Sequence, residues 1–426
     1  MRLGRAIARA CRWPTFLGSI LLLYWSVVCV ALSYHFKWLN LRGRRNDVLG
    51  WSGGMKWWVR AKVLKVGDRE LYRGPCVYLF NHRSWGDFIV DQYATEGRSL
   101  FMSRLTVLFV FPTFMGALKV LKSVITFKRG AIADKERFNN WIDEQRAASP
   151  QTGLSVYPEG HRSTAPVSLP LKRGMLYYAH SRRLPVQVII GANKEAIISE
   201  KHCTARLNQT AAVGYSDPIM TADYPDFEAF WEQVQEAWNK TWAEVYGADW
   251  EGLPELAPGS AGWQDPDTHY PLSVTLPMVG VVLANFAAFA GVSWLAFRAL
   301  SALFALFGPA QPLALALVAA YLALSFYLYS RPVDALQLHE RLRRESKHPS
   351  HLARSAAHLA GPRGVDANGA AAAEARVAAL RHARPTHRPT PYLGRRRPLA
   401  APPARAPPRL SLRAPSAATA VARGML

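Results

Sequence analysis

A histidine and an aspartate, His82 and Asp87, stand five residues apart where a buried strand gives way to a helix. The apolar run Cys76–Phe80 predicts the strand, and Trp85–Val90 predicts the start of the helix, with Ser84 as its N-cap. On one continuous helix, a five-residue spacing would point the two side chains about 140° apart. With the histidine on the turn and the aspartate in the first helical turn, the carboxylate can instead fold back onto the imidazole.

This pairing would allow general-base chemistry. A carboxylate on one ring nitrogen fixes the tautomer of His82 and stabilises its charged form, which leaves the other nitrogen to remove a proton near neutral pH. The arrangement is a serine-protease triad without its serine, so the hydroxyl would have to come from a substrate. The pair alone is more typical of a capped turn that carries a surface ion pair.

A second polar stretch, Tyr157–Ser163 (YPEGHRS), also follows a predicted strand, Gly153–Val156. Gly160 permits an unusual backbone angle. Arg162 offers a planar fork of donors that suits a phosphate, and Ser163 adds a hydroxyl. This second polar turn at a strand end favours a functional site over a capped turn alone.

Four blocks of the sequence resemble those of the glycerolipid acyltransferases, of the 1-acylglycerol-3-phosphate acyltransferase (lysophosphatidic acid acyltransferase) type. Asn81–Asp87 (NHRSWGD) is similar to the N-H-x4-D block, and Tyr157–Ser163 is similar to the F-P-E-G-T-R-S block. Ile125–Arg129 resembles the block that ends in a phosphate-binding arginine, and Leu184–Ile190 resembles the proline-led strand of the fourth block. The four blocks have the family's order and spacing and cover about residues 70–220.

Two positions depart from the family pattern. Tyr157 replaces the usual phenylalanine, which is a mild change, and His161 replaces the usual threonine. The second departure bears on the subclass and on the acceptor.

The resemblance implies an α/β fold, an acyltransferase-type mixed sheet with flanking helices. It also implies acyl transfer from acyl-CoA to the sn-2 hydroxyl of 1-acylglycerol-3-phosphate, which gives phosphatidic acid. His82 would be the general base and Asp87 its orienting partner, with Glu159 expected to hold Arg162 or an acceptor hydroxyl. No cofactor or metal is expected, since acyl-CoA is a substrate. The resemblance assigns these residues to the acceptor site: Arg129, Glu159, Gly160, Arg162 and Ser163.

Other functions remain open at this point. The acceptor could be glycerol-3-phosphate or another lysophospholipid. A protein of another class, an inactive membrane-anchored scaffold that binds anionic lipid, would have no use for the intact pair of His82 and Asp87.

Charge is distributed unevenly along the 426 residues, whose net charge is +22. Residues 331–426 account for +13 of this excess. A basic balance favours anionic partners such as phospholipid headgroups, and nucleic acid is not expected because the tail lacks interleaved aromatic residues. The four cysteines are scattered, which favours reduced thiols in a cytosol-facing protein.

Apolar runs predict membrane segments at both ends of the catalytic region. Trp13–Phe36 contains no Asp, Glu, Lys or Arg and is predicted to be a membrane anchor, and two spanning helices are expected at about 273–297 and 311–330. The positive-inside rule then puts the catalytic domain and the tail in the cytosol. Arginines before Trp13 conflict with a single N-terminal crossing, and a re-entrant or interfacial segment would remove the conflict. The expected location is the endoplasmic reticulum membrane, with the plastid envelope as the alternative.

Residues 49–66 mix tryptophans with lysine and arginine. This composition suits either the lipid headgroup layer or an ordinary core-facing helix or strand. The stretch 225–246 predicts a helix with an aromatic stripe that packs into a core. Together these patterns predict the following division: an N-terminal membrane anchor and interfacial segment (1–66), an acyltransferase domain (67–250), a linker (251–271), two transmembrane helices (272–332) and a basic Ala/Pro/Arg-rich disordered tail (333–426).

Overall fold

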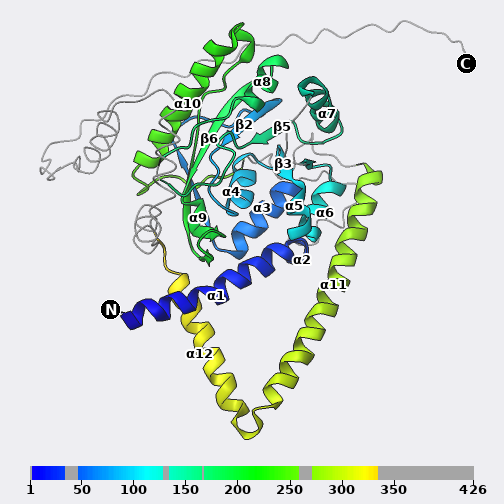
Figure 1. Ribbon diagram of the computed structural model, residues 1–426, viewed down its shortest axis with the longest axis vertical. Helices are drawn as coiled ribbons and strands as arrows, with labels where there is room; N and C mark the ends of the chain where they lie inside the picture. Colours follow the sequence, from blue (N-terminus) through cyan, green and yellow to red (C-terminus); the bar gives the residue numbers. More distant parts are fainter. Residues whose placement is uncertain (1, 34–46, 128–133, 166, 259–270, 334–426) are drawn as a thin grey trace, which may run out of the picture. The chain divides into compact units, whose positions relative to one another are not determined.

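The computed structural model of the chain describes residues 2–33, 47–127, 134–165, 167–258 and 271–333 (Figure 1). Arg129, most of the predicted linker and nearly all of the basic tail lie outside these residues. Predictions that concern them therefore stay predictions.

A seven-stranded mixed sheet forms the centre of the catalytic region, with strand order β1-β9-β6-β2-β5-β3-β4. The strands from β6 to β4 run parallel to one another, while β9 is antiparallel to β6 and parallel to β1. The predicted α/β fold with a mixed sheet is confirmed. The strands are β1 Lys62–Val66, β2 Cys76–Phe80, β3 Ser99–Arg104, β4 Val124–Phe127, β5 Gly153–Val156, β6 Val186–Ala192 and β9 Thr210–Tyr215.

The central strand β2 is buried along its whole length, as its continuous apolar sequence predicts. Val77 pairs with Leu154 of β5 on one side and with Val186 of β6 on the other. This register brings the carboxyl ends of β2, β5 and β6 to the same edge of the sheet. Ligands of parallel α/β sheets bind at that edge.

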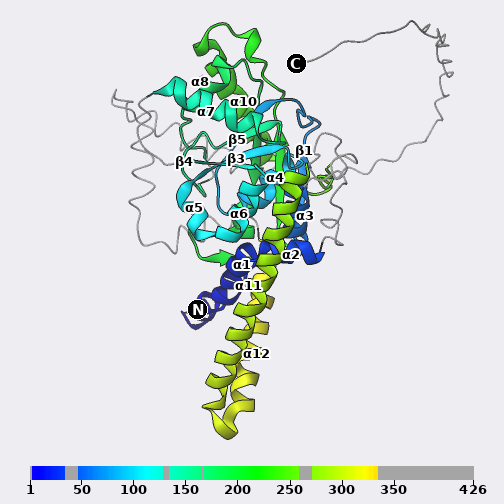
Figure 2. The ribbon, with the colours of Figure 1, turned by 90° about the vertical axis from the view of Figure 1, so that its right-hand side faces the viewer.

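Helices cover both faces of the sheet (Figures 1 and 2). Tyr78 and Phe80 of β2 pack toward α3, α4 and α6, while the alternate residues Val77 and Leu79 pack toward α7, α8 and α10. These helices are α3 Asp47–Trp58, α4 Asp87–Ala94, α6 Pro112–Val120, α7 Lys135–Ala147, α8 Gly174–Ser181 and α10 Phe227–Gly247. A small hairpin follows β6, formed by α9 Lys194–Ile197, β7 Ile198–Ser199 and β8 Thr204–Ala205.

The predicted boundary of the catalytic domain at residue 67 is wrong. Leu49 and Met55 of α3 are fully buried in the core, and β1 begins the sheet at Lys62. Only the end of α3 matches the interfacial alternative, since Trp57 and Trp58 are exposed. The stretch 49–66 is therefore largely part of the folded domain.

Helix starts follow side-chain caps where the chain supplies them. Asp226 accepts a hydrogen bond from the Ala229 N–H and caps α10, as expected for an aspartate before a helix. The prediction of Ser84 as the N-cap of the helix after β2 is wrong, because α4 begins at Asp87. The Ser84 hydroxyl instead accepts the Gly86 N–H within the turn, at 3.1 Å.

The N-terminal region is not one continuous span over Trp13–Phe36. It contains two helices, α1 Arg2–Tyr24 and α2 Ser26–Ser33, which meet at Trp25. α1 packs beside α12 (Gln311–Tyr329), where Ser325 and Tyr321 donate to backbone carbonyls of α1. Among the helices of the described residues, α1 is long enough to cross a membrane but is not apolar enough to count as a candidate span.

Two helices of the described part of the chain are long and apolar enough to cross a membrane, α11 (Leu272–Ala305) and α12. The break between them lies at Gly308–Ala310, where the sequence places it, but α11 continues past the expected end at residue 297. Arg298 does not interrupt the helix, and its guanidinium lies 5.7 Å from the Trp294 ring. A long basic side chain can extend along a helix toward a polar surface, so one arginine need not end a span.

Trp238 of α10 is expected to stabilise the core because it is among the largest fully buried side chains and donates to the Ser168 hydroxyl at 2.9 Å. Trp238→Ala should lower the free energy of unfolding by about 3–5 kcal/mol. The exposed Trp57 provides the matched control, and Trp57→Ala should change it by less than about 0.5 kcal/mol. Chemical denaturation of the detergent-solubilised chain measures both, and equal losses would contradict the assignment.

Candidate active site

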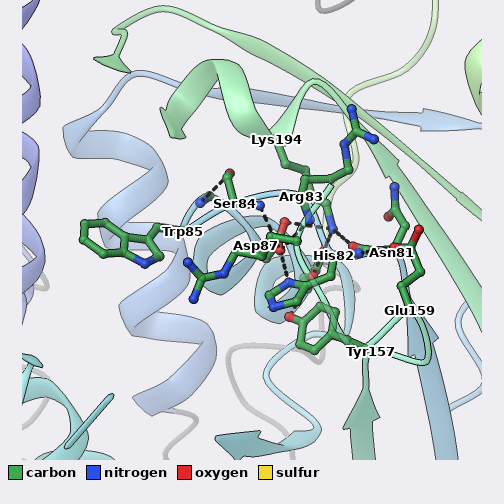
Figure 3. A network of polar contacts seen from close by, with 12 residues as sticks. Asn81, His82, Arg83, Ser84, Trp85, Asp87, Tyr157, Glu159 and Lys194 are labelled. Carbon is green, nitrogen blue, oxygen red and sulfur yellow. Dashed lines mark hydrogen bonds and ion pairs between the residues drawn. The ribbon is translucent and has the colours of Figure 1, made fainter. Parts of the chain in front are cut away.

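The imidazole of His82 and the carboxylate of Asp87 are in direct contact at the carboxyl end of β2. His82 Nδ1 lies 2.6 Å from Asp87 Oδ2, and the same oxygen accepts the N–H groups of Arg83 and Ser84 at 2.8 and 3.1 Å (Figure 3). The expected fold-back of the carboxylate onto the imidazole is therefore present. The His82 side chain keeps 23% of its surface exposed, so a ligand can reach the ring.

Asp87 is buried, yet its environment favours the charged form. Burial alone would raise the pKa of its carboxyl group, but the Lys194 ammonium, the contact with His82 and the Arg83 N–H together bring that pKa below its usual value. Asp87 is consequently an anion that can stabilise a proton on His82.

The turn that carries His82 is fixed to the neighbouring strand β6. The Asn81 amide donates to the Gly191 carbonyl and accepts the Gly191 N–H, both at 2.8 Å. At Gly86 the chain runs so close to the backbone of Lys194 that an added Cβ would lie 2.2 Å from its carbonyl oxygen. A glycine at this position allows the turn and the loop after β6 to touch.

Glu159 holds the backbone of His82. Its Oε2 accepts the His82 N–H at 2.8 Å, its Oε1 accepts the Leu169 N–H at 2.9 Å, and the Ser163 N–H donates to the His82 carbonyl at 2.8 Å. Of the two partners expected for Glu159, Arg162 pairs with Glu200 instead, and the acceptor hydroxyl stays a prediction. Gly160 has a φ of +69°, which agrees with the predicted need for an unusual backbone angle.

Arg162 is placed beside the His82–Asp87 turn by a different carboxylate. Its guanidinium pairs with Glu200, whose second oxygen accepts the Trp85 N–H at 3.1 Å. The Arg162 side chain is 30% exposed and remains accessible to an anion. Ser163 is mostly buried, and its hydroxyl accepts the Ala165 N–H at 3.2 Å.

A buried ion pair that the sequence patterns did not reveal joins the turn after β2 to helix α9. Arg83 Nη2 lies 2.5 Å from Glu195 Oε1, and Arg83 also donates to the carbonyls of Thr164 and Ala165 at 3.0 and 2.6 Å. Burial opposes the charge of Arg83, but Glu195 outweighs this effect and raises the pKa of the guanidinium. Arg83 therefore connects the turn after β2 to α9 through Glu195 and to the loop after β5 through the two carbonyls.

A second missed group, Lys194, Asp91 and Tyr157, adjoins the His82–Asp87 contact, and Figure 3 shows Lys194 and Tyr157 beside it. Lys194 Nζ lies 2.8 Å from Asp91 Oδ1 and 3.2 Å from Asp87 Oδ1, and the ring of Tyr157 stacks on that of His82. The sequence spacing could have revealed Asp91, because it lies four residues after Asp87 and residues four apart share a helix face. No pattern in the sequence predicts that Lys194 contacts these aspartates. Within the described residues, no group of three or more His, Cys, Asp or Glu side chains is arranged to hold a metal ion.

Part of the chain is similar to known proteins. Residues 62–190 match the model of a family described as Acyltransferase. These residues form an acyltransferase domain. The matched residues begin at β1, end within β6 and include both polar turns.

Two further proteins are similar to this chain. A 1-acyl-sn-glycerol-3-phosphate acyltransferase of Cocos nucifera is 23% identical over 211 residues, which are 47% of this chain and 64% of that protein. The chain thus matches less than two thirds of that relative's length. The crystal structure of the 1-acyl-sn-glycerophosphate (LPA) acyltransferase PlsC of Thermotoga maritima aligns with 48% of this chain and 80% of that chain, at 15% identity and a TM-score of 0.40.

Removing the charge of Glu195 should destabilise the acyltransferase domain, because the buried guanidinium of Arg83 would lose its partner. We expect Glu195→Gln to lower the free energy of unfolding by about 3–5 kcal/mol. The exposed pair of Arg173 and Glu228 is the matched control, where Glu228→Gln should have little effect. Denaturation of both variants measures the difference, and a similar small loss in each would show that the buried pair does not stabilise the site.

Proposed function

We propose that the chain is a membrane-bound acyltransferase that moves a fatty acyl group from acyl-CoA to the sn-2 hydroxyl of 1-acylglycerol-3-phosphate, giving phosphatidic acid. The observation that carries the proposal is the 2.6 Å contact between His82 and Asp87 inside a domain that matches the acyltransferase family. The activity in the name of the coconut relative supports the choice of acceptor.

In the proposed reaction, His82 acts through its second ring nitrogen, Nε2. It takes the proton of the acceptor hydroxyl while that oxygen attacks the thioester carbonyl. The new C–O bond forms, the C–S bond breaks, and the imidazolium returns the proton to the departing thiolate. Asp87 stabilises the imidazolium, and general-base help of this kind is worth about 10²–10⁴-fold in rate.

The phosphate of the acceptor is proposed to bind to Arg162 and Arg129. Arg162 lies beside the reacting turn and is partly exposed, so a phosphate could replace or share its contact with Glu200. Gly160 lets the backbone approach the ligand and Ser163 borders it. Glu159 contributes indirectly, because it holds the backbone of His82.

The proposed setting of the reaction is a bilayer surface. The apolar helices α11 and α12 would hold the domain at the membrane, with acyl chains kept in lipid while the headgroups reach His82. We propose the endoplasmic reticulum, with the domain on the cytosolic side. Transfer to glycerol-3-phosphate or to another lysophospholipid is the alternative within the class. Acyl-transfer assays with a series of acceptors that differ in headgroup distinguish these reactions.

Replacement of the proposed base tests the reaction directly. His82→Ala should lower acyl transfer from oleoyl-CoA to 1-acylglycerol-3-phosphate by about 10²–10⁴-fold, measured with labelled donor in membranes. His180 provides the control, because it lies on α8 at the opposite face of the sheet, and His180→Ala should retain activity in proportion to folded protein. Equal rates for wild type and His82→Ala would refute the assignment of the base.

Loss of Arg162 should weaken acceptor binding more than chemistry. Arg162→Ala is expected to raise the KM for 1-acylglycerol-3-phosphate by about 10-fold or more, since a charge-assisted contact to phosphate contributes about 1.5–3 kcal/mol. The KM for acyl-CoA should change little. Arg173→Ala, on an exposed surface pair, is the matched control. An unchanged acceptor KM would remove Arg162 from the phosphate site.

A further inference from the structure

Three charged side chains are enclosed directly behind the His82–Asp87 contact. Lys194 is 0% exposed, Asp91 1% and Asp87 2%. Lys194 Nζ lies 2.8 Å from Asp91 Oδ1, 3.2 Å from Asp87 Oδ1 and 2.8 Å from the Asn81 carbonyl. Charges this deep are stable only when they are paired, so the three groups must be considered together.

The two oxygens of Asp87 face different partners. Oδ2 contacts Nδ1 of His82 and accepts hydrogen bonds from two backbone N–H groups, whereas Oδ1 is buried and accepts no hydrogen bond. The ammonium of Lys194 at 3.2 Å is the ion-pair partner of this second oxygen. The orientation and charge of Asp87 therefore depend on Lys194.

Tyr157 closes the group on the other side. Its ring stacks on the His82 imidazole, with ring centres 4.2 Å apart, and its hydroxyl donates to Asp91 Oδ2 at 3.0 Å. A ring of contacts thus runs from His82 through Asp87, Lys194, Asp91 and Tyr157 back to His82. The tyrosine hydroxyl, the feature that distinguishes this residue from the phenylalanine expected there, has a defined partner.

The charges of this cluster do not cancel. One ammonium faces two carboxylates, so the cluster carries one negative charge when both aspartates are ionised and His82 is neutral. Burial, together with the charge of Asp87, raises the pKa of Asp91 to about 7 against the opposing effect of Lys194. Asp91 is therefore close to its own titration at neutral pH, and its charge adds to that of Asp87 only when it is ionised.

We propose that Lys194, Asp91 and Tyr157 are positioning residues that set how tightly His82 holds a proton, by fixing the charge and orientation of Asp87. The catalytic meaning of this inference rests on the proposed function, but the electrostatic effect does not. Lys194 opposes protonation of His82 and Asp91 favours it. Tyr157 stabilises the charged form of Asp91 and keeps the imidazole plane in place.

Other ionisable groups surround the cluster and stay constant in the test. Glu159, from the loop after β5, faces the backbone of His82, and burial raises the pKa of its carboxyl group. Arg83 is paired with Glu195 and Arg162 with Glu200. Because none of these is altered, a difference between variants reports on Lys194 and Asp91.

The experiment is a pH titration of the His82 imidazole by NMR, in full-length protein labelled at histidine and held in detergent micelles. His82→Gln identifies the signal. Lys194→Met should move the titration midpoint to higher pH, and Asp91→Asn should move it to lower pH, each by roughly one pH unit. The double variant should return close to wild type, because one charge of each sign is removed. Tyr157→Phe should give a smaller shift in the direction of Asp91→Asn.

Acyl transfer provides the second readout. The acidic limb of the pH profile of kcat/KM should move in the same direction as the NMR midpoint in each variant. Glu96→Gln is the matched control, because Glu96 is also a buried carboxylate paired with basic side chains but lies past the far end of α4, beside Arg73 and Arg98. It should leave both midpoints unchanged.

Opposite shifts for Lys194→Met and Asp91→Asn support the inference, since a loss of folded protein alone would move neither midpoint. Unchanged midpoints, or shifts in one direction for both, overturn it. If Lys194→Met does not fold, judged by circular dichroism, the inference requires a lower midpoint in Asp91→Asn and a midpoint close to wild type in the double variant, and any other result overturns it. If the two variants show opposite NMR shifts but the wild type has no acyltransferase activity, the proposed function is refuted and the electrostatic inference stands.

Discussion

The carboxylate of Asp87 is the constraint on which the site depends. An anion with 2% of its side chain exposed is stable only if donors and a counter-charge surround it. These partners come from separate segments: His82, Arg83 and Ser84 from the turn after β2, and Lys194 from the loop after β6. The sheet order brings those two strands side by side, and β5 on the other side of β2 delivers Tyr157 and Glu159. The parallel arrangement of these three strands is thus what makes a buried, ionised aspartate possible beside a histidine.

Sequence patterns predicted the parts of this site that are local along the chain. The buried strand β2, the turn and the contact of His82 with Asp87 follow from hydrophobic runs and from a five-residue spacing. Lys194 could not be predicted in the same way, because it follows a strand like any solvated lysine and meets Asp91 across 103 residues of sequence. The error at Ser84 has a related cause. A serine before a helix favours capping, but the carboxylate of Asp87 turns back toward the Ser84 N–H, and the helix begins only at Asp87 itself.

Hydropathy predicted two long apolar helices at one end of the chain, and both are present, whereas the apolar run at the other end is divided between two helices. α11 and α12 are long and apolar, as their composition predicts. In α1 and α2 the apolar residues divide into two sets, since Cys11, Leu23 and Val28 are buried against the protein while Leu17 and Leu21 are exposed. An apolar residue that packs on a neighbouring helix and one that faces lipid contribute equally to a hydropathy average. Only the tertiary contacts distinguish them, which is why the N-terminal segment could not be assigned from composition.

The two long apolar helices and the site are also less separate than a division into segments suggests. After α12, the chain is held by the loop before β9: the Gln209 amide donates to the Arg331 carbonyl at 2.9 Å, and its oxygen accepts the Val333 N–H at 3.0 Å. The Val333 carbonyl in turn accepts a hydrogen bond from the Asn193 amide at 3.1 Å. Asn193 has a φ of 64°, a left-handed conformation that asparagine tolerates better than most residues, and it directly precedes Lys194. The segment that follows the second apolar helix therefore supports the backbone turn that places Lys194 in the core. Val333 and Asn193 thus connect the end of α12 to the charge behind His82.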